Sequence, residues 1–581
     1  MFPPPIVRPL PLITFICLLL TLIDHPNALR VLVSAPNLFH SHLHMHSAIA
    51  DVLVEEGGHD VTLLVPMWDV VSGNPPPVEK TNWTRAQRVI RHFPNDADAQ
   101  TLRQGIAKMP FANNDIWTND NDQVFTERTL QLYTEILTTA CSALHSSSQL
   151  FSALSSSSSS APAFDVAIAE WFDFSSLALF HRLGIPTTLI TSALPLDSVL
   201  ARYLGIPMPA YVPIINKASP EGTKMDLWRR FMNYIDKRRN MQLDQIINTV
   251  ANSVFGKNFP SPQELTLRAS FLLLNTNEML DLARPTSNKI KHIGGFLLDS
   301  DYPKSAVAKT MAKDHSMPSA SAPSVFVSFG SVADPNKMPP QMLRAFLHTF
   351  ASFPELDFVW RFPTQKGTDD EARCPNGTLF GNKIPANVRL VQWVDQHAIL
   401  AHPNTRAFVS HCGLNSLNEA ATAGVPLLCV PLFGDQNYNA AIVQHHQNGI
   451  VLLKKHLNKE RLQSALRELV ADEKANRYLR NAKVISRKIT RAPFRPREIV
   501  RKFVEYSAEF GGQFSEMNLE GAKMGEWAQN GLDFLVPLAL TMSALILISV
   551  SVIGIVIKKV ISRGQRLLLT VRRHDQKGKD D

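Results

Sequence analysis

The stretch from residue 393 to residue 436 constrains the fold of this chain more than any other. Residues 406–410 have the length and apolar content of a buried strand, a His-Cys-Gly turn follows, and residues 414–423 have the pattern of a helix. Gly424 is a suitable stop for that helix, and residues 425–431 have the composition of the next buried strand. This order of elements is typical of a parallel sheet covered by helices.

Polar residues line one face of the predicted helix. His411, Asn415 and Glu419 follow one another at intervals of four residues, so they share a face that begins at the positive end of the helix. A helix N-terminus behind a glycine turn binds phosphate through free backbone N–H groups. The pattern therefore favours a diphosphate at His411 and Asn415, with ribose hydroxyls further along at Glu419. The alternative is an ordinary crossover whose polar residues face solvent.

These 44 residues resemble the donor-binding signature of the UDP-glycosyltransferases, the family that includes the UDP-glucuronosyltransferases. In that family a Trp stacks on uracil and a Gln three residues later helps to hold it, which implies these roles for Trp393 and Gln396. An acidic residue and a Gln close the signature and bind hydroxyls of the transferred sugar, as Asp435 and Gln436 would here. The resemblance assigns phosphate and ribose contacts to His411, Gly413, Asn415, Ser416 and Glu419.

Length and charge limit the other classes of function. A chain of 581 residues is too long for one hydrophobic core, so we expect two domains with appendages. The formal net charge is +8, but eight Lys or Arg and only three Asp residues follow residue 557. The basic character therefore belongs mostly to the tail, and we expect no nucleic-acid partner.

The cysteines leave the redox state open. Cys17 falls in the predicted leader, and the other four cysteines have neither metal-ligand spacing nor the density of a small disulfide scaffold. A disulfide could form in an oxidising compartment, but the spacing requires none. Those four cysteines are Cys141, Cys374, Cys412 and Cys429.

The N-terminus has the features of a secretory leader. Arg8 precedes an apolar run over residues 10–23 that is short for a membrane span, and Ala28 is a candidate cleavage residue. A retained signal anchor is the alternative. Acceptor sequons begin at Asn82 and Asn376, and they matter only if this part of the chain enters the secretory pathway.

The mature chain opens with a βαβ pattern. We predict a strand over residues 30–35, a helix over residues 47–56 and a strand over residues 59–65. A tract with histidines at every second position lies between the first strand and the helix. Such a tract can bind metal, but no acidic or Cys residue accompanies it, and we expect no metal site. The four histidines are His40, His42, His44 and His46.

The family resemblance places a catalytic His after the first strand in a Ser-His context, which implies His42, with His40 as second choice. An imidazole suits this role because it titrates near neutral pH and can accept the proton of an attacking hydroxyl. The family also supplies an Asp at the end of a later strand to orient that imidazole. The matching strand covers residues 164–169, and the position after it is Glu170, with Asp173 as the fallback. A Glu keeps the charge but adds a methylene group.

The second domain is predicted to begin after a linker rich in Pro and Ser at residues 316–324. A strand over residues 325–328 leads into a Gly-Ser turn, where the backbone can approach a phosphate. In the family the Ser of this turn contacts the nucleotide, which implies Ser331. Residues 497–510 are predicted to form a helix that returns to brace both domains.

Residues 534–557 hold 24 uncharged residues, enough to cross a hydrocarbon core of ~30 Å. Lys558 and Lys559 follow, so the tail is expected to be cytosolic. The last residues, 577–581, resemble the dilysine retrieval signals of endoplasmic reticulum proteins. We therefore expect a single-pass type I protein of the endoplasmic reticulum membrane with a lumenal body.

The sequence thus predicts an α/β protein of the GT-B fold, with two Rossmann-like domains facing a cleft and a C-terminal transmembrane helix. The expected reaction is inverting transfer of a sugar from UDP-glucuronate or UDP-glucose to a small lipophilic acceptor, without a cofactor. A non-catalytic UDP-sugar-binding membrane protein is the alternative of another class, and self-association is expected by resemblance. The predicted segments are a signal peptide at 1–28, an acceptor domain at 29–315, the linker at 316–324, a UDP-sugar domain at 325–494, bracing helices at 495–533, a transmembrane helix at 534–557 and a cytosolic tail at 558–581.

Overall fold

The computed structural model describes residues 28–37, 40–67, 84–109, 114–117, 127–155, 162–215, 222–298, 317–319, 321–362, 378–379, 382–392, 394–472, 476–529 and 531–577. Trp393, the asparagines of both sequons, the predicted leader up to residue 27 and the last four residues of the tail lie outside this part of the chain. By contacts, the chain divides into one compact unit up to Asn518 and a second unit from Leu519 onward.

The first sheet of the compact unit is parallel throughout and has the order β3-β2-β1-β4-β5-β6-β7 within the described residues. The strands are short and rich in β-branched and Leu residues, and most of them are buried on both faces, as crossover helices require. The elements are β1 (Arg30–Ser34), α2 (His40–Glu55), β2 (Asp60–Pro66), β3 (Arg88–His92), α3 (Asp96–Ala107), η1 (Asn114–Trp117), α4 (Glu127–Ser146), α5 (Ser148–Leu154), β4 (Val166–Glu170), α6 (Phe174–Arg182), β5 (Thr187–Ser192), α7 (Ser198–Tyr203), α8 (Leu227–Phe255), α9 (Pro262–Arg268), β6 (Leu272–Leu274) and β7 (Ile290–His292).

The start of α2 corrects the sequence prediction. The helix begins at His40 rather than at residue 47, so His42 lies in its first turn and not in a loop. Neither Pro nor Gly interrupts the histidine tract, and His42, Met45 and His46 recur at helical spacing, so the tract can bury one face. The exposed His44 lies between these buried positions. The side chain of His40 lies outside the described residues.

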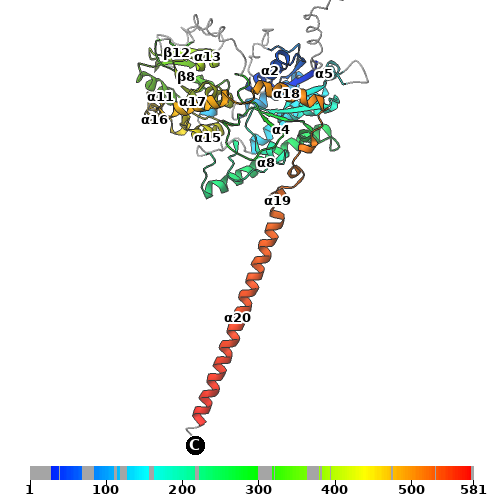
Figure 1. Cartoon of the computed structure of the whole chain (residues 1–581), viewed down its shortest axis with the longest axis vertical. Helices are drawn as coiled ribbons and strands as arrows, with labels where there is room; N and C mark the ends of the chain where they lie inside the picture. Colours follow the sequence, from blue (N-terminus) through cyan, green and yellow to red (C-terminus); the bar gives the residue numbers. More distant parts are fainter. Residues whose placement is uncertain are drawn as a thin grey trace, which may run out of the picture. The chain divides into compact units, whose positions relative to one another are not determined.

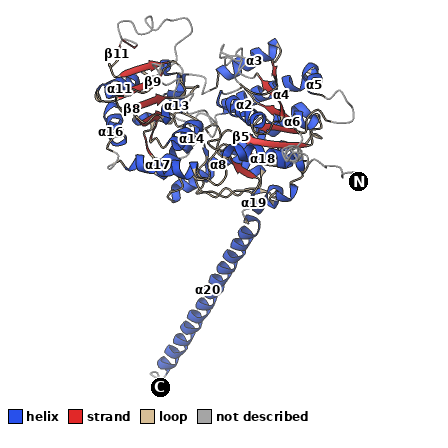
Figure 2. Cartoon of the chain, turned by 45° about the horizontal axis from the view of Figure 1, so that its top comes forward, coloured by secondary structure: helices blue, strands red, loops and turns tan. Residues whose placement is uncertain are grey.

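The second sheet is also parallel and has the order β12-β9-β8-β13-β14-β15. Figure 2 shows the two sheets as separate groups of strands, each among its own helices. The elements are β8 (Ser324–Ser328), η4 (Pro335–Lys337), α11 (Pro340–Ala351), β9 (Asp357–Arg361), β10 (Thr378–Leu379), β11 (Asn382–Lys383), β12 (Val388–Val391), α13 (Gln396–Ala401), β13 (Thr405–Ser410), α14 (Leu414–Ala423), β14 (Leu427–Cys429), α15 (Gln436–His446), β15 (Gly449–Val451), η6 (Lys454–His456), α16 (Lys459–Leu469) and α17 (Arg477–Thr490). The predicted helix at 414–423 is confirmed, and Gly424 ends it in the left-handed conformation, whereas β14 is shorter than predicted.

Both sheets have a topological switch point, where neighbouring strands lead to crossovers in opposite directions. In the first sheet this point lies between β1 and β4, and in the second it lies between β8 and β13. Open parallel sheets bind their ligands at the carboxyl ends of the strands at such points. The fold therefore indicates where both halves of a site should be sought.

Two segments pack in the core of the other domain rather than in the domain that their position in the sequence suggests. The helix α18 (Pro496–Glu509) follows the second sheet, yet its Val500 and Val504 belong to the core of the first, and its Arg497 forms ion pairs with Glu55 and Glu56 at the C-terminal end of α2. Figure 1 shows α18 beside α2. Conversely, Trp117 of η1 is buried in the core of the second domain and donates to the Asp334 carbonyl at 3.2 Å. These exchanges join the two domains.

The second unit contains η8 (Glu520–Lys523), α19 (Glu526–Gln529) and α20 (Leu532–Lys577), while η7 (Ser515–Met517) ends the first unit. The helix α20 has 46 residues, includes Pro537 and continues through the basic residues after 557. Its apolar part is long enough, by length and composition, to cross a membrane, and its side chains are exposed.

Candidate active site

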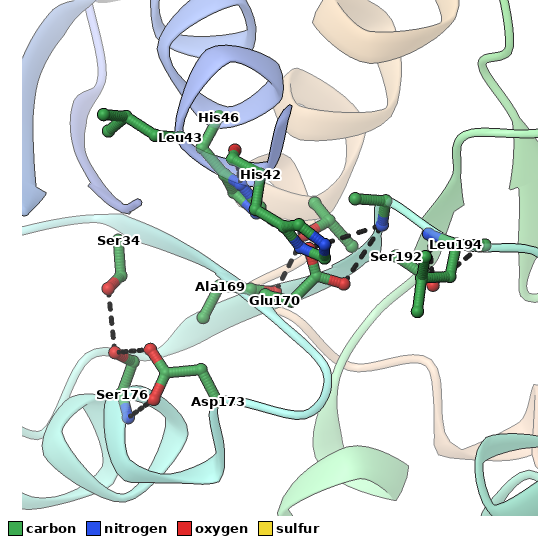
Figure 3. Close-up of polar contacts among 12 residues, drawn as sticks. Ser34, His42, Leu43, His46, Ala169, Glu170, Asp173, Ser176, Ser192 and Leu194 are labelled. Carbon is green, nitrogen blue, oxygen red and sulfur yellow. Dashed lines mark hydrogen bonds and ion pairs between the residues drawn. The ribbon is translucent and has the colours of Figure 1, made fainter. Parts of the chain in front are cut away.

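The first half of the site lies at the switch point of the first sheet. His42 comes from the first turn of α2, and Glu170 is the last residue of β4. Both side chains are buried, and His42 Nδ1 lies 3.2 Å from Glu170 Oε2. Figure 3 shows the carboxylate between α2 and the loop that follows β5. The structure thus brings together the two residues that the resemblance paired.

The surroundings of Glu170 fix its orientation and imply the tautomer of His42. The Ala193 N–H donates to Glu170 Oε1 at 3.0 Å, which holds the carboxylate from the side of β5. An ionised carboxylate only accepts, so His42 Nδ1 carries the proton in this pair. The other ring nitrogen, Nε2, is then free of a proton and is the atom that can accept one from a substrate.

The fallback Asp173 has a different role. It caps the N-terminus of α6, where the hydroxyls of Ser175 and Ser176 both donate to its carboxylate at 2.5 Å. Burial raises the pKa of Asp173, although these hydroxyl bonds oppose the increase. Ser34 joins the cluster through Ser176, as Figure 3 shows. The structure therefore places Glu170, and not Asp173, against His42.

A second histidine contacts the same carboxylate. His46 lies one turn after His42 on α2, and its Nε2 is 3.8 Å from Glu170 Oε2 and 2.7 Å from Thr191 Oγ1. Its Nδ1 lies 2.8 Å from the carbonyl oxygen of His42. From the sequence, His46 stood out only as part of a possible metal tract, and its helical spacing from His42 was the signal that could have singled it out.

The second half of the site lies at the switch point of the other sheet. His411 follows β13, and its ring fits between two glycines, since a Cβ atom on either Gly330 or Gly413 would lie 2.6 Å from His411 Nε2. Arg361, at the end of β9, donates to the Gly330 carbonyl at 2.8 Å. Desolvation and the nearby Arg361 lower the pKa of His411 to about 4, so its imidazole is neutral. The exposed Ser331 follows Gly330 in the same turn.

Three residues of the donor signature meet on one side of α14. The Gln396 side-chain amide, at the start of α13, donates to Ser416 Oγ at 3.2 Å and to the carboxylate of Glu419. Desolvation raises the pKa of Glu419 to about 7, against the lowering effect of the Gln396 hydrogen bond. Asn415, in contrast, accepts from the Asn275 side chain of the first domain at 2.9 Å.

The closing pair of the signature begins α15. Asp435 accepts from Asn439 Nδ2 at 2.7 Å, and the same amide group donates to the carbonyl of Cys412 at 2.9 Å, so Asn439 ties this pair to the His411 turn. Gln436 is buried, and its Oε1 accepts from the backbone of Leu432 at 2.7 Å. Desolvation raises the pKa of Asp435, while Asn439 and His42 act to lower it. His42 thus lies close enough to Asp435, across the two domains, to influence its charge.

Two further features of the donor turn were not foreseen. Cys412 and Cys429 form a disulfide bond between the turn after β13 and the end of β14, with 5.4 Å between their Cα atoms. Cys412 has a φ of 62°, so the turn holds a non-glycine residue in the left-handed region. Arg361 was also missed, because nothing local marks a strand-end arginine as part of a site. In the described part of the chain, no group of three or more His, Cys, Asp or Glu side chains is placed to hold a metal ion.

Comparison with known proteins identifies the architecture. The family described as "UDP-glucoronosyl and UDP-glucosyl transferase" matches residues 30–566. A Caenorhabditis briggsae protein provisionally named UDP-glucuronosyltransferase ugt-47 is 26% identical over 531 residues, covering 90% of this chain and 92% of the relative. The human UDP-glucuronosyltransferase 3A2 is 27% identical over 356 residues, which cover 60% of this chain and 63% of the human protein.

The fold is that of the GT-B glycosyltransferases, as predicted. A crystal structure of UDP-glucose: anthocyanidin 3-O-glucosyltransferase in complex with UDP superimposes with a TM-score of 0.51, covering 83% of this chain and 99% of that one. Its sequence identity is 15%, so this likeness concerns the fold alone.

Proposed function

Because the chain belongs to the UDP-glucuronosyl and UDP-glucosyl transferase family, we propose that it transfers the sugar of UDP-glucuronate or UDP-glucose to a small lipophilic alcohol, phenol or acid. His42 Nε2 accepts the acceptor proton while the acceptor oxygen bonds to the anomeric carbon. The bond from that carbon to the diphosphate oxygen breaks, and UDP leaves with the electron pair. A single displacement of this kind inverts the anomeric centre.

The contact between the buried His42 and Glu170 is the observation that carries this proposal. Glu170 lies 3.2 Å from one ring nitrogen and stabilises the imidazolium that forms when the other nitrogen takes a proton. Asp435, which the resemblance assigns to the sugar hydroxyls, is within electrostatic reach of His42 although it belongs to the other domain. A proton acceptor close to the sugar-binding residue is what glycosyl transfer to a hydroxyl requires.

The donor turn can neutralise the diphosphate with protein groups. Arg361 supplies a positive charge next to the Gly330 turn, and the N-terminus of α14 supplies backbone N–H groups, while neutral His411 holds the shape of the turn through its hydrogen bond to the Ser328 backbone. Gln396, Ser416 and Glu419 would hold the uridine ribose, and Trp393 would stack on uracil. We therefore expect activity without a divalent cation, which EDTA treatment would test directly.

The identity of the sugar stays open between glucuronate and glucose. Asp435 and Gln436 could serve either sugar through hydroxyl contacts. Arg361 does not distinguish them, because it donates to the Gly330 carbonyl, in the turn that the proposal assigns to the diphosphate.

The cellular placement is part of the proposal. The apolar helix α20 followed by basic residues favours a membrane protein with a lumenal body and a cytosolic tail, and the leader and tail favour the endoplasmic reticulum. The Cys412–Cys429 disulfide fits an oxidising lumen. Treatment with an N-glycosidase should increase the gel mobility of the wild type but not of a variant that lacks Asn82 and Asn376. Self-association in the membrane is expected by family resemblance.

The decisive experiment uses microsomes that contain the full chain. They are incubated with pooled phenolic and steroidal acceptors and either UDP-glucuronate or UDP-glucose, and products are detected by mass spectrometry. A hexuronic acid adduct or a hexose adduct, absent in a His42→Ala variant, supports the proposal and identifies the donor. UDP binding without any adduct would instead favour a non-catalytic UDP-sugar-binding membrane protein.

A further inference from the structure

His46 is a fully buried polar side chain that the proposed reaction does not use. Its ring contacts α2, β4 and β5 at once, through the His42 carbonyl, the Glu170 carboxylate and the Thr191 hydroxyl. Figure 3 shows it next to His42, with both rings directed toward Glu170. A buried imidazole with partners on three elements is a specific construction rather than a space-filling core residue.

The hydrogen bonds of His46 define its protonation. The His42 carbonyl can only accept, so the proton of His46 lies on Nδ1. Burial lowers the pKa of His46, although Glu170 opposes the decrease, and the ring is therefore neutral. Its Nε2 then bears a lone pair, which accepts the Thr191 hydroxyl proton across 2.7 Å.

A neutral His46 leaves the shared carboxylate oxygen to His42. Glu170 Oε2 lies 3.2 Å from His42 Nδ1 and 3.8 Å from His46 Nε2, so both rings compete for the same atom in principle. The Nδ1–H of His46 bonds the His42 carbonyl, and its Nε2 accepts from the Thr191 hydroxyl. His46 therefore has no N–H left to donate to the carboxylate. The ring instead fills the space beside Glu170 and limits its movement away from His42.

We propose that His46, held by Thr191, is a positioning residue that keeps the Glu170 carboxylate directed at His42 Nδ1. This inference rests on the proposed function, because it assigns His46 a role through the proton acceptor. The longer reach of Glu170 compared with an Asp gives the carboxylate one more rotatable bond, and His46 is the side chain that restrains it from the side of α2.

The first test is the His46→Leu variant of the full chain in microsomes. Leu fills similar space without a polar atom, and Thr191 can turn its hydroxyl to the Ala169 carbonyl, 3.2 Å away, so no buried group loses all its partners. We expect kcat to fall roughly 10- to 100-fold through the misplaced carboxylate, with the KM for UDP-sugar unchanged. His46→Gln, whose side-chain amide reaches the position of Nε2 and can bond Thr191, should recover most of the rate. His44→Leu, an exposed position on the same helix, is the matched control and should behave as the wild type.

A double-mutant cycle separates positioning from general stability. Thr191→Val is nearly isosteric and removes only the hydroxyl, so it should lower kcat like His46→Leu, and the double variant should be no slower than either. In a His42→Ala background, His46→Leu should have no further effect. Additive losses, or a His46→Leu loss that persists without His42, would overturn the inference. If His46→Leu fails to fold, the Thr191→Val variant is the test by itself. A wild-type kcat in that variant would refute the positioning role of His46.

The outcomes also separate this inference from the proposed function. Full activity of His42→Ala would refute the proposed proton acceptor, whatever His46 does. A slow His42→Ala variant together with wild-type kcat in both His46→Leu and Thr191→Val would refute only the role of His46.

Discussion

Each domain places a histidine at the switch point of its sheet, but the two histidines follow strands on opposite sides of that point and have opposite surroundings. His42 follows the first strand of one sheet and faces the carboxylate of Glu170, whereas His411 follows β13 of the other sheet and lies near the guanidinium of Arg361. Both occupy the carboxyl ends of strands at a switch point. The fold therefore supplies one histidine at each switch point, and the neighbouring charge determines what each histidine can do.

The difference has a direct chemical meaning. A carboxylate next to an imidazole stabilises its protonated form, which suits a group that must take a proton. A guanidinium next to an imidazole, together with burial, keeps the ring neutral, which suits a group that shapes a binding turn without titrating. Under the proposed function, the first arrangement serves proton transfer and the second serves binding.

The largest expected effect comes from removing the first histidine. His42→Ala should lower kcat by roughly 10²–10⁴-fold, as for the loss of a general base, and leave the affinity for UDP near that of the wild type. Steady-state kinetics and equilibrium dialysis with UDP measure the two quantities. A loss of UDP affinity of the same size would contradict the division of labour between the domains. If His40→Ala instead lost the rate, the assignment to His42 would be wrong.

The disulfide distinguishes the two locations structurally. Cys412 and Cys429 are 17 residues apart in sequence, so removing their bond should lower the unfolding free energy of the second domain by roughly 2–4 kcal/mol. The measurement is the thermal midpoint of the wild type and of the Cys412→Ala/Cys429→Ala variant, each with and without a reductant. Reductant should lower the thermal midpoint of the wild type but not that of the Cys412→Ala/Cys429→Ala variant. The Cys141→Ala variant, which loses a buried free thiol, is the control and should keep the response to reductant.

Removing the second histidine should affect binding. His411→Ala removes the ring between Gly330 and Gly413 and leaves the Ser328 backbone without this partner, at a cost of about 1–3 kcal/mol, so we expect a roughly 5- to 100-fold decrease in kcat/KM for the UDP-sugar. Because the imidazole is neutral well above a pKa of about 4, the pH dependence of the variant should match that of the wild type between pH 6 and 8. A change in the shape of that profile would show that His411 titrates during turnover.

The smallest effect concerns Glu419. Its pKa of about 7 means that the carboxyl gains a proton as the pH falls through neutrality and then loses capacity to accept from ribose hydroxyls. The KM for the UDP-sugar should therefore rise several-fold between pH 8 and pH 6, by roughly 1 kcal/mol of binding. Glu419→Gln should show a raised KM that is independent of pH over this range. A flat profile in the wild type would contradict the raised pKa.

Part of the site could be predicted because its residues are close in sequence. The helix at 414–423, its glycine stop and the strand before it follow from local apolar spacing, and Gln396, Ser416 and Glu419 lie within one such segment. The partner of His42 required a choice between Glu170 and Asp173, which local pattern could not make. The two differ by three residues, but one ends a strand and the other caps the next helix.

The start of α2 shows a limit of pattern reading. The alternating histidines were assigned to the loop between the predicted strand and helix, where the family resemblance places the catalytic His. In the structure the side chains of His42 and His46 are buried, and each has a polar partner on the sheet. They therefore belong to the buried face of the helix despite their polarity. Their partners Glu170 and Thr191 are 128 and 145 residues away in sequence, and no window of the chain contains both sides of these contacts.

By itself, the sequence determined the α/β class, the family and the donor-binding segment, because each depends on spacing within a few turns of chain. Only the tertiary structure decided which carboxylate faces His42, that Arg361 stands at the donor turn, that Cys412 pairs with Cys429, and that Asn275 meets Asn415 across the domains. These contacts arise where strands distant in sequence become neighbours in a sheet. The protonation of a buried group depends on such neighbours, which is why the roles of the two histidines diverge only in the folded protein.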